Sequence, residues 1–188
     1  MEDLFRDLFQ DLRTRMEKTL RKIQDELKTI RTGRASVHLF DHIHVDYYGT
    51  SMPVSQVATI RIPEPSLVII QPWEPRMLSV IEKAILTSDL GLSPVNDGKS
   101  LKIPIPPLTE ERRREFTKQV WKIAEEGKTA IRMIRRDGNE TVKQMEREKM
   151  CSEDDAYRAR QEIQKLTDEY VRKIEELARA KEEEIMTT

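Results

Sequence analysis

The chain has few of the residues that form enzyme pockets and covalent cross-links. Of its 188 residues, one is cysteine (Cys151), six are glycine and 5% are aromatic. A single cysteine excludes an intrachain disulfide and is typical of a reducing compartment. The glycines are scattered along the chain and form no phosphate-binding loop. The low aromatic content argues against a large aromatic-lined pocket. No apolar run approaches the ~20 residues needed to cross a bilayer, so we expect no membrane contact.

Candidate catalytic and metal-binding residues form no recognisable motif. Cys151 has no histidine near it in the sequence, so a tolerated thiol is the simpler interpretation than a nucleophile. His38, His42 and His44 lie close together and could bind a metal, or they could be solvent-facing residues of a strand. We favour the second interpretation, because no further ligand motif accompanies them. We therefore predict a protein that is not an enzyme and holds no metal or cofactor.

Charge is abundant and nearly balanced. Lys and Arg number 33 against 34 Asp and Glu, and charged residues make up 36% of the chain, which is typical of long solvated helices. The N-terminal segment MEDLFRDLFQDL is acidic and amphipathic, unlike a secretory signal or an Arg-rich transit peptide. We expect a soluble, intracellular, cytoplasmic protein.

Three stretches have the periodicity of amphipathic helices. Apolar residues recur every three or four positions over residues 1–31. A second helix is expected after Pro107, with Thr109 as its N-cap, and should extend about 60 Å to Met150. Ser152, followed by three acidic residues, predicts the cap of a third helix. The expected apolar stripe of the second helix has a near-heptad spacing: Phe116, Val120, Ile123, Ala130, Ile134, Thr141 and Met145.

Residues 32–106 have a different pattern. Short runs rich in Val and Ile predict strands at 42–47, 57–62, 67–70 and 101–105, and a short helix is expected after Pro75. Tyr48-Gly49-Thr50 and Asn96-Asp97-Gly98 are turn signals. Six basic and seven acidic residues make this stretch charge-poor. A small domain therefore interrupts a helical one.

The predicted fold class is α+β, an elongated three-helix bundle with an inserted small α/β domain. The bundle should comprise residues 1–31 and 107–188, and the insert residues 32–106. Two short chain crossings, near 31–34 and 104–107, would form a hinge of restricted range. The expected hinge residues are Thr32, Gly33, Ile105, Pro106 and Pro107.

The second helix carries a basic stripe. Lys128, Arg132, Arg135, Arg136 and Lys143 are spaced by four, three, one and seven residues, which places them on one face at roughly 100° per residue. A basic face predicts a polyanionic partner, and arginine suits the forked contact with phosphate. No aromatic residues interleave with the stripe, so contacts with the phosphates and shape of folded RNA fit better than base stacking.

Other interpretations remain open. The stripe could be an ordinary charged surface with local pairs such as Arg132–Asp137 or Arg136–Glu140. The whole chain could be a coiled-coil adaptor that binds partner helices, or an RNA chaperone without preference for one RNA.

Seven segments, in order along nearly the full length, resemble bacterial ribosome recycling factors. They are Ile30–Ser36 (IRTGRAS), Tyr47–Thr50 (YYGT), Glu82–Leu92, Pro104–Arg113, Arg132–Asp137 (RMIRRD), Ser152–Asp155 (SEDD) and Gln164–Asp168 (QKLTD). The resemblance implies an L-shaped molecule of two domains that acts, most simply as a monomer, on the ribosome after peptide release. With the GTP-hydrolysing elongation factor G, it would separate the subunits and release mRNA and tRNA.

The resemblance also implies roles for particular residues. Arg132, Arg135 and Arg136 match the arginines through which the family contacts ribosomal RNA of the large subunit, with Lys128 and Lys143 as flanking support. Arg31 is a weaker RNA-binding candidate, and closing a helix end is an equal alternative. Gly138 departs from the family pattern, which typically has alanine there. Glycine costs about 1 kcal/mol in a helix relative to alanine, so we expect local loosening.

Overall fold

The chain folds into two compact units that are discontinuous in sequence. The computed structural model describes residues 2–187. The first unit contains the chain up to Ile30 and residues Arg114–Glu184, and the second contains Arg31–Arg113 together with the residues from Ile185 onward. The boundaries thus lie at Ile30/Arg31, Arg113/Arg114 and Glu184/Ile185, whereas the sequence placed the second one near 106/107 and gave no third one. Within residues 2–187, none of the helices combines the length and the apolar character needed to cross a membrane.

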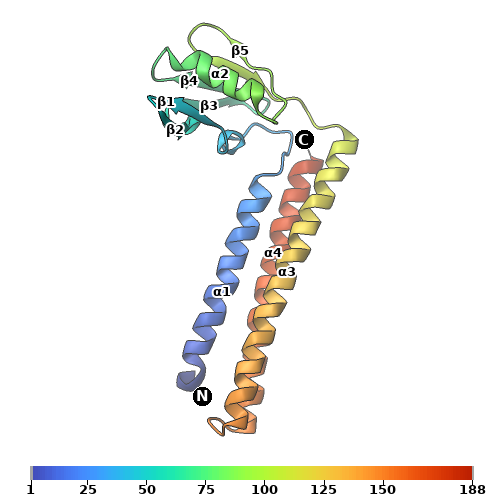
Figure 1. Cartoon of the computed structure of the whole chain (residues 1–188). Coiled ribbons are helices and arrows are strands. Elements are labelled where there is room, and N and C mark those ends of the chain that lie inside the picture. Colours follow the sequence, from blue (N-terminus) through green and yellow to red (C-terminus); the bar gives the residue numbers. More distant parts are fainter. Residues whose placement is uncertain (1, 188) are drawn as a thin grey trace. The chain divides into compact units, whose positions relative to one another are not determined.

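The first unit is a bundle of three long helices. They are α1 (Glu2–Lys28), α3 (Glu110–Arg147) and α4 (Glu153–Met186), shown in Figure 1. The predicted caps are confirmed, because the Arg112 N–H donates to the hydroxyl of Thr109 (3.2 Å) and the Asp155 N–H donates to that of Ser152 (3.0 Å). The 38 residues of α3 make it about 57 Å long.

Two glycines let α1 and α4 approach α3 closely. A Cβ atom on Gly138 would lie 2.6 Å from Leu12 Cδ1 of α1 and 3.3 Å from Ile163 Cδ1 of α4. Because glycine has no Cβ atom, the Leu12 side chain can occupy this space. Gly138 is buried, and α3 continues through it without a break.

A second layer repeats the arrangement. A Cβ atom on Gly127 would lie 2.8 Å from Ile23 Cγ1 and 3.3 Å from Ile174 Cδ1. Gly127 lies eleven residues before Gly138 in α3. Ile23 and Ile174 each lie eleven residues after their counterparts in the Gly138 layer, because α1 and α4 run antiparallel to α3. Both glycines belong to a series of buried α3 residues spaced by four and three in turn, which is the heptad spacing expected from the sequence: Val120, Ala124, Gly127, Ile131, Ile134 and Gly138.

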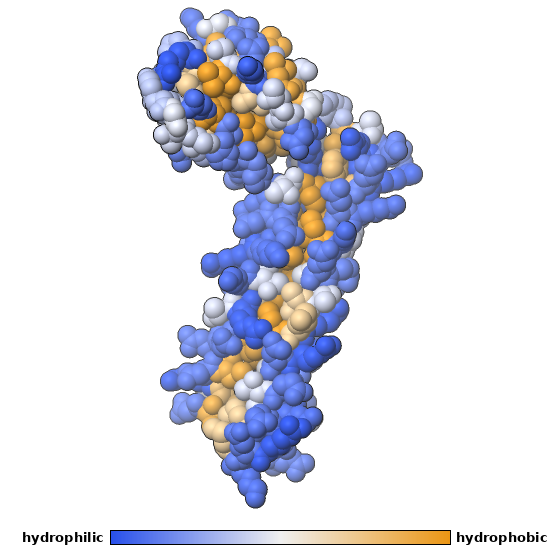
Figure 2. All heavy atoms as spheres, in the orientation of Figure 1, coloured by the Kyte–Doolittle hydropathy of each residue, from blue (hydrophilic) through white to orange (hydrophobic). Residues whose placement is uncertain are grey.

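The buried face of α3 matches the predicted stripe only in part. Val120 and Ile134 are buried, Thr141 is exposed, and the remaining members are half-buried, so the prediction was wrong at Thr141. Buried residues of α3 are Val120, Ala124, Gly127, Lys128, Ile131, Ile134, Gly138 and Val142. Two glycines and an alanine in this set gave no hydrophobic signal, which is why the stripe was misread. In Figure 2, apolar residues gather along a seam between α1 and α3, and hydrophilic residues cover most of the visible bundle surface.

The second unit contains two small antiparallel sheets and one helix. Strands β1 (His44–Tyr47) and β2 (Thr50–Pro53) form a hairpin. Strands β3 (Ala58–Glu64), β4 (Leu67–Pro72), β6 (Leu101–Pro104) and β5 (Val95–Asn96) form a sheet in that order. Helix α2 (Met77–Thr87) contacts β1 and β4. The 3-10 helices η1 (Val37–Phe40) and η2 (Val54–Gln56) complete the unit.

The crossings between the units have different local structures. Gly33 has φ of +79°, a backbone conformation that suits glycine. Ile105 is 4% exposed, and its N–H donates to the carbonyl of Ser66 (2.7 Å). The prediction that Ile105 belongs to the hinge was therefore wrong, since it is anchored in the second unit. Pro106 and Pro107 are exposed and lie outside helices and strands.

The predicted turn at Asn96-Asp97-Gly98 is confirmed by an Asp97 hydrogen-bond network. The Asp97 carboxylate accepts hydrogen bonds from the N–H groups of Lys99 (2.9 Å) and Ser100 (2.7 Å) and from the Ser100 hydroxyl (3.0 Å). These bonds, with the Lys99 N–H first, lower the pKa of Asp97 to about 2. The turn thus favours ionised Asp97.

The Gly127 layer predicts that adding one methyl group destabilises the bundle. Gly127→Ala should lower the free energy of unfolding by up to about 2 kcal/mol, because overpacking outweighs the gain in helix propensity. In an Ile23→Ala background the same change should instead stabilise by about 1 kcal/mol, since the clash is gone. Urea unfolding followed by circular dichroism measures both. Stabilisation in both backgrounds would contradict the close approach.

The Asp97 network predicts an acid-sensitive second unit. The pKa of Asp97 is lower in the folded chain than in the unfolded one, so its contribution is complete above about pH 4 and is lost as the pH falls through about 2. Asp97→Ala should reduce this pH dependence. Fluorescence of Trp73 in a Trp121→Phe background would report unfolding of this unit. An unchanged pH profile in Asp97→Ala would argue against the network.

Candidate nucleic-acid interface

Three basic residues project from the outer side of α3. Arg132, Arg136 and Lys143 are exposed, and helix geometry places them within about 40° of one another around the axis. Along the axis they span about 16 Å, since eleven residues separate the first from the last. They lie opposite the face that packs on α1 and α4. We call these three residues the α3 basic row.

The row makes no direct ion pair within the part of the chain that the structure describes, although Arg132 lies near enough to Glu175 of α4 to contribute to the lowered pKa of that carboxylate. Over residues 2–187, the structure gives its members no hydrogen bond and no ion pair. Asp137, which the sequence offered as a partner of Arg132, instead accepts from Arg15 Nη2 of α1 at 2.8 Å. Glu140 makes no ion pair with Arg136 either. The alternative interpretation, a charged face compensated by its own acids, therefore loses its two proposed pairs.

Arg135 lies at the edge of the row. It is half-buried, and its Nη1 donates a long bond of 3.5 Å to Gln164 Oε1 on α4. Gln164 in turn donates to Asp168 (2.9 Å). Arg135 therefore faces the seam between α3 and α4, while the row faces solvent.

Lys128 does not belong to the exposed stripe, which corrects the sequence interpretation. It is 7% exposed, and its Nζ lies 2.9 Å from Glu175 Oε1 of α4 and 3.1 Å from Glu125 Oε1. The hydrogen bond with Glu175 raises the pKa of Lys128 and lowers that of Glu175, so both groups stay charged. Lys128 is thus a structural link between α3 and α4, with its charge already satisfied.

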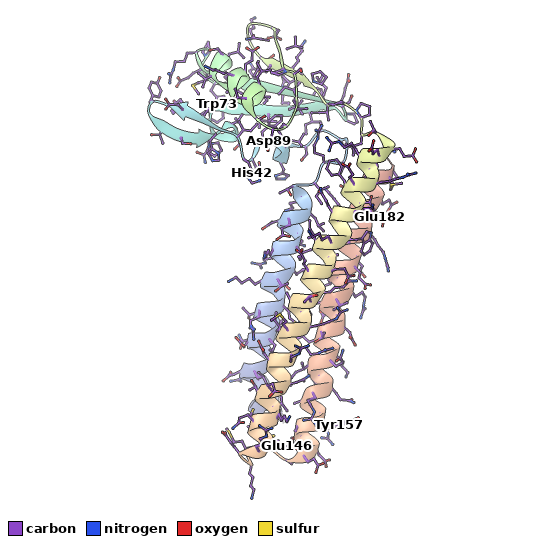
Figure 3. The ribbon with its side chains drawn as sticks, turned by 45° about the vertical axis from the view of Figure 1, so that its right-hand side comes forward. His42, Trp73, Asp89, Glu146, Tyr157 and Glu182 are labelled. Carbon is purple, nitrogen blue, oxygen red and sulfur yellow. The ribbon has the colours of Figure 1, made fainter. Side chains whose placement is uncertain are left out.

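Sequence spacing alone could not identify this role. Glu175 is 47 positions from Lys128 in the sequence, and only the packing of α4 on α3 brings the two together. Trp121 lies on the same side of α3: its ring centroid is 5.9 Å from the Lys128 ammonium, and its Nε1 donates to Glu182 (3.1 Å), labelled in Figure 3. The α3–α4 seam is therefore held by polar links as well as by apolar contacts.

The other candidates have structural surroundings. Arg31 is half-buried and its Nη1 donates to the carbonyl of Leu90 (3.2 Å), an observation that favours the structural alternative over RNA binding.

His38 Nδ1 lies 3.0 Å from Asp41 Oδ2. Burial raises the pKa of the Cys151 thiol, which makes the nucleophilic thiolate scarcer. Among the residues that the structure describes, no group of three or more His, Cys, Asp or Glu could hold a metal ion.

A second set of basic residues lies between α1 and α4. Arg13, Lys18, Arg21 and Lys173 line an open groove of about 660 Å³ that also contains Glu17 and Tyr170. Glu169 lies 3.2 Å from Lys173 and 3.9 Å from Arg13, so a carboxylate offsets part of this charge. Arg21 is an exposed arginine off the α3 basic row, and its substitution offers a control.

Comparison with known proteins relates this bundle to one family. The sequence model described as "Ribosome recycling factor" matches residues 23–186. The chain belongs to the ribosome recycling factor family. A ribosome-recycling factor of Nitratidesulfovibrio vulgaris is 54% identical over 94% of this chain and 95% of its own length. One from Carboxydothermus hydrogenoformans is 47% identical over 98% of this chain and 100% of its own length.

Solved structures of ribosome recycling factors share the fold. A solution structure of the factor matches with a TM-score of 0.79 and 39% identity over the whole of both chains. A second match, with a TM-score of 0.68 and 45% identity, covers 96% of this chain and 98% of the other. That other chain is described among models of the T. thermophilus ribosome recycling factor and E. coli elongation factor G bound to the E. coli post-termination complex. The α+β architecture predicted from the sequence is confirmed.

Proposed function

We propose that this ribosome recycling factor binds the post-termination ribosome in the cytoplasm and, with the GTPase elongation factor G, separates the subunits. mRNA and tRNA are thereby released for another round of translation. The chain acts by binding and not by catalysis, with GTP hydrolysed by its partner. Family membership and the post-termination complex named for a structural relative support this role.

The observation that supports the binding part is the α3 basic row, whose members make no hydrogen bond or ion pair within residues 2–187. Ribosomal RNA presents dense phosphate charge, and unpaired cations on a rigid helix can engage it without first breaking an intramolecular ion pair. Arg132 and Arg136 supply forked donors, and Lys143 adds a point charge. Arg135 flanks them at the α4 seam. Lys128 is not part of the proposed site, because its ammonium group is already paired with Glu175 inside the bundle.

The second unit would act as the moving part. Two short crossings connect it to the bundle, so elongation factor G could displace it while the row keeps the bundle on RNA. The close packing at Gly127 and Gly138 keeps the bundle stiff, which lets a force at one end act along its length. In this proposal the bundle is an anchor and the second unit is the lever arm.

The α3 basic row predicts selective losses of ribosome affinity. Arg132→Ala and Arg136→Ala should each weaken binding about tenfold, as expected for a lost charge-assisted contact. Each should also reduce the slope of log affinity against log salt by about one. Unfolding curves should stay close to those of the parent, since both residues are exposed. Sedimentation with vacant ribosomes over a salt series, with a generic RNA competitor, measures the effect.

Two variants control for charge and for location. Arg21→Ala removes an exposed arginine on the side toward α4, and Lys128→Met removes a cation of α3 that is buried. Both should bind ribosomes about as well as the parent, although Lys128→Met should be less stable because Glu175 loses its nearest cation. Equal losses in all four variants would contradict a site on the α3 basic row. Equal competition by any RNA would favour a general RNA chaperone.

The hinge is tested better at the prolines than at Gly33. Gly33→Pro is unsuitable, because φ of +79° is unavailable to proline and that change would alter the chain path. Replacing Pro106 and Pro107 by glycine loosens the second crossing without removing a backbone donor. We expect slower subunit splitting at unchanged ribosome affinity, as light scattering and sedimentation would show. Parallel losses of both activities would contradict a separate hinge role.

A further inference from the structure

One arginine at the seam between α3 and α4 faces an amide where the seam elsewhere has carboxylates. Arg135 is half-buried, and its Nη1 donates to Oε1 of Gln164 on α4 at 3.5 Å. Within residues 2–187, Arg135 makes no ion pair. The other polar links of this seam include two ion pairs, Lys128–Glu175 (2.9 Å) and Glu146–Arg160 (3.6 Å).

The surroundings of Arg135 on its own helix contain no acid. Side chains three and four positions away are its neighbours on a helix surface. Asp137, only two positions away, points in another direction and accepts from Arg15 of α1. Nothing on α3 therefore compensates the charge of Arg135. Its neighbours at one turn are Ile131, Arg132, Gly138 and Asn139.

Asp168 fixes the orientation of the Gln164 amide. Gln164 Nε2 donates to Asp168 Oδ1 one turn further along α4 (2.9 Å). A carboxylate only accepts hydrogen bonds and a guanidinium only donates them, so both partners require the same orientation of the amide. Its nitrogen faces Asp168 and its oxygen faces Arg135. The three side chains thus form a chain of hydrogen bonds with one direction.

Stability of the bundle does not explain this chain. Gln164 and Asp168 are exposed, and a bond of 3.5 Å is at the long limit for a hydrogen bond, so its contribution to the free energy of unfolding is small. A long bond to a neutral oxygen is, however, easily exchanged for a shorter, charge-assisted bond to phosphate. A carboxylate in its place would hold the guanidinium in an ion pair that RNA must first break.

We propose that Gln164 is a positioning residue for RNA binding. It holds the Arg135 guanidinium beside the α3 basic row while leaving its positive charge available to a phosphate. A residue of α4 thereby takes part in RNA recognition through an arginine of α3. The proposal rests on the function proposed above and adds to it a requirement for a neutral side chain at position 164.

Gln164→Glu keeps the length of the side chain and adds one negative charge. The new carboxylate should pair with Arg135, so ribosome affinity should fall about tenfold, as for a lost charge-assisted contact. The slope of log affinity against log salt should decrease by about one, because one phosphate contact is lost. The thermal unfolding midpoint should stay within about 2 °C of the parent, since the new pair offsets repulsion from Asp168. Sedimentation with vacant ribosomes over a salt series and circular dichroism measure these effects.

Three further variants isolate the contact with Arg135. Gln161→Glu adds the same charge at another exposed position of α4, where the amide donates to the hydroxyl of Tyr157 (2.8 Å), labelled in Figure 3, and it should weaken binding less than about threefold. Gln164→Met removes the acceptor without adding charge, so the loss should be similarly small and the salt slope unchanged. In an Arg135→Ala background, Gln164→Glu should weaken binding no more than Gln161→Glu does, because the arginine that it captures is gone.

Each contrary result has a distinct meaning. Equal losses in Gln164→Glu and Gln161→Glu would show general charge repulsion and overturn the proposal. A full additional loss in the Arg135→Ala background would place the effect outside Arg135, and unchanged affinity of Arg135→Ala alone would leave nothing to position; both overturn it. An unfolding midpoint more than about 5 °C lower in Gln164→Glu would assign Gln164 to packing instead. Failure of the proposed function would appear elsewhere, as unchanged ribosome affinity in Arg132→Ala and Arg136→Ala.

Discussion

The absence of a side chain at two positions of α3 determines how the bundle packs. Gly127 and Gly138 allow α1 and α4 to lie where a methyl group would collide with Ile23 or Leu12. Because the two layers are eleven residues apart, they fix the rotation of α3 at two points along its axis. The side opposite the glycines then faces solvent throughout, and that side carries the α3 basic row. A packing constraint thus orients the charges.

The two units differ in how they use polar residues. In the bundle, acids and bases outside the basic row form links between helices, such as Lys128–Glu175 and Arg15–Asp137. These pairs neutralise charges that spacing along one helix would assign to a partner. In the second unit, charge is scarce. The bundle is therefore the unit suited to a polyanion.

Much of the fold follows from local rules. Thr109 and Ser152 cap their helices as predicted, because capping depends on residues within one turn. The turn at Asp97 is equally local. Errors arose where a residue's environment comes from another segment: Ile105 was assigned to the hinge although Ser66 holds it. The role of Gly138 could not be predicted, because a glycine carries no hydrophobic signal and its neighbours are distant in sequence.

The bundle with its inserted α/β unit, the helix ends, and the outward-facing pair Arg132 and Arg136 could all be predicted from the sequence. Periodicity and capping suffice for these, since each depends on spacing along one helix. Tertiary packing determines which cations are available to a partner. It removed Lys128 by bringing Glu175 against it, and it released Arg132 from Asp137 by giving that carboxylate to Arg15. Availability depends on distances between helices, which spacing along one helix does not contain.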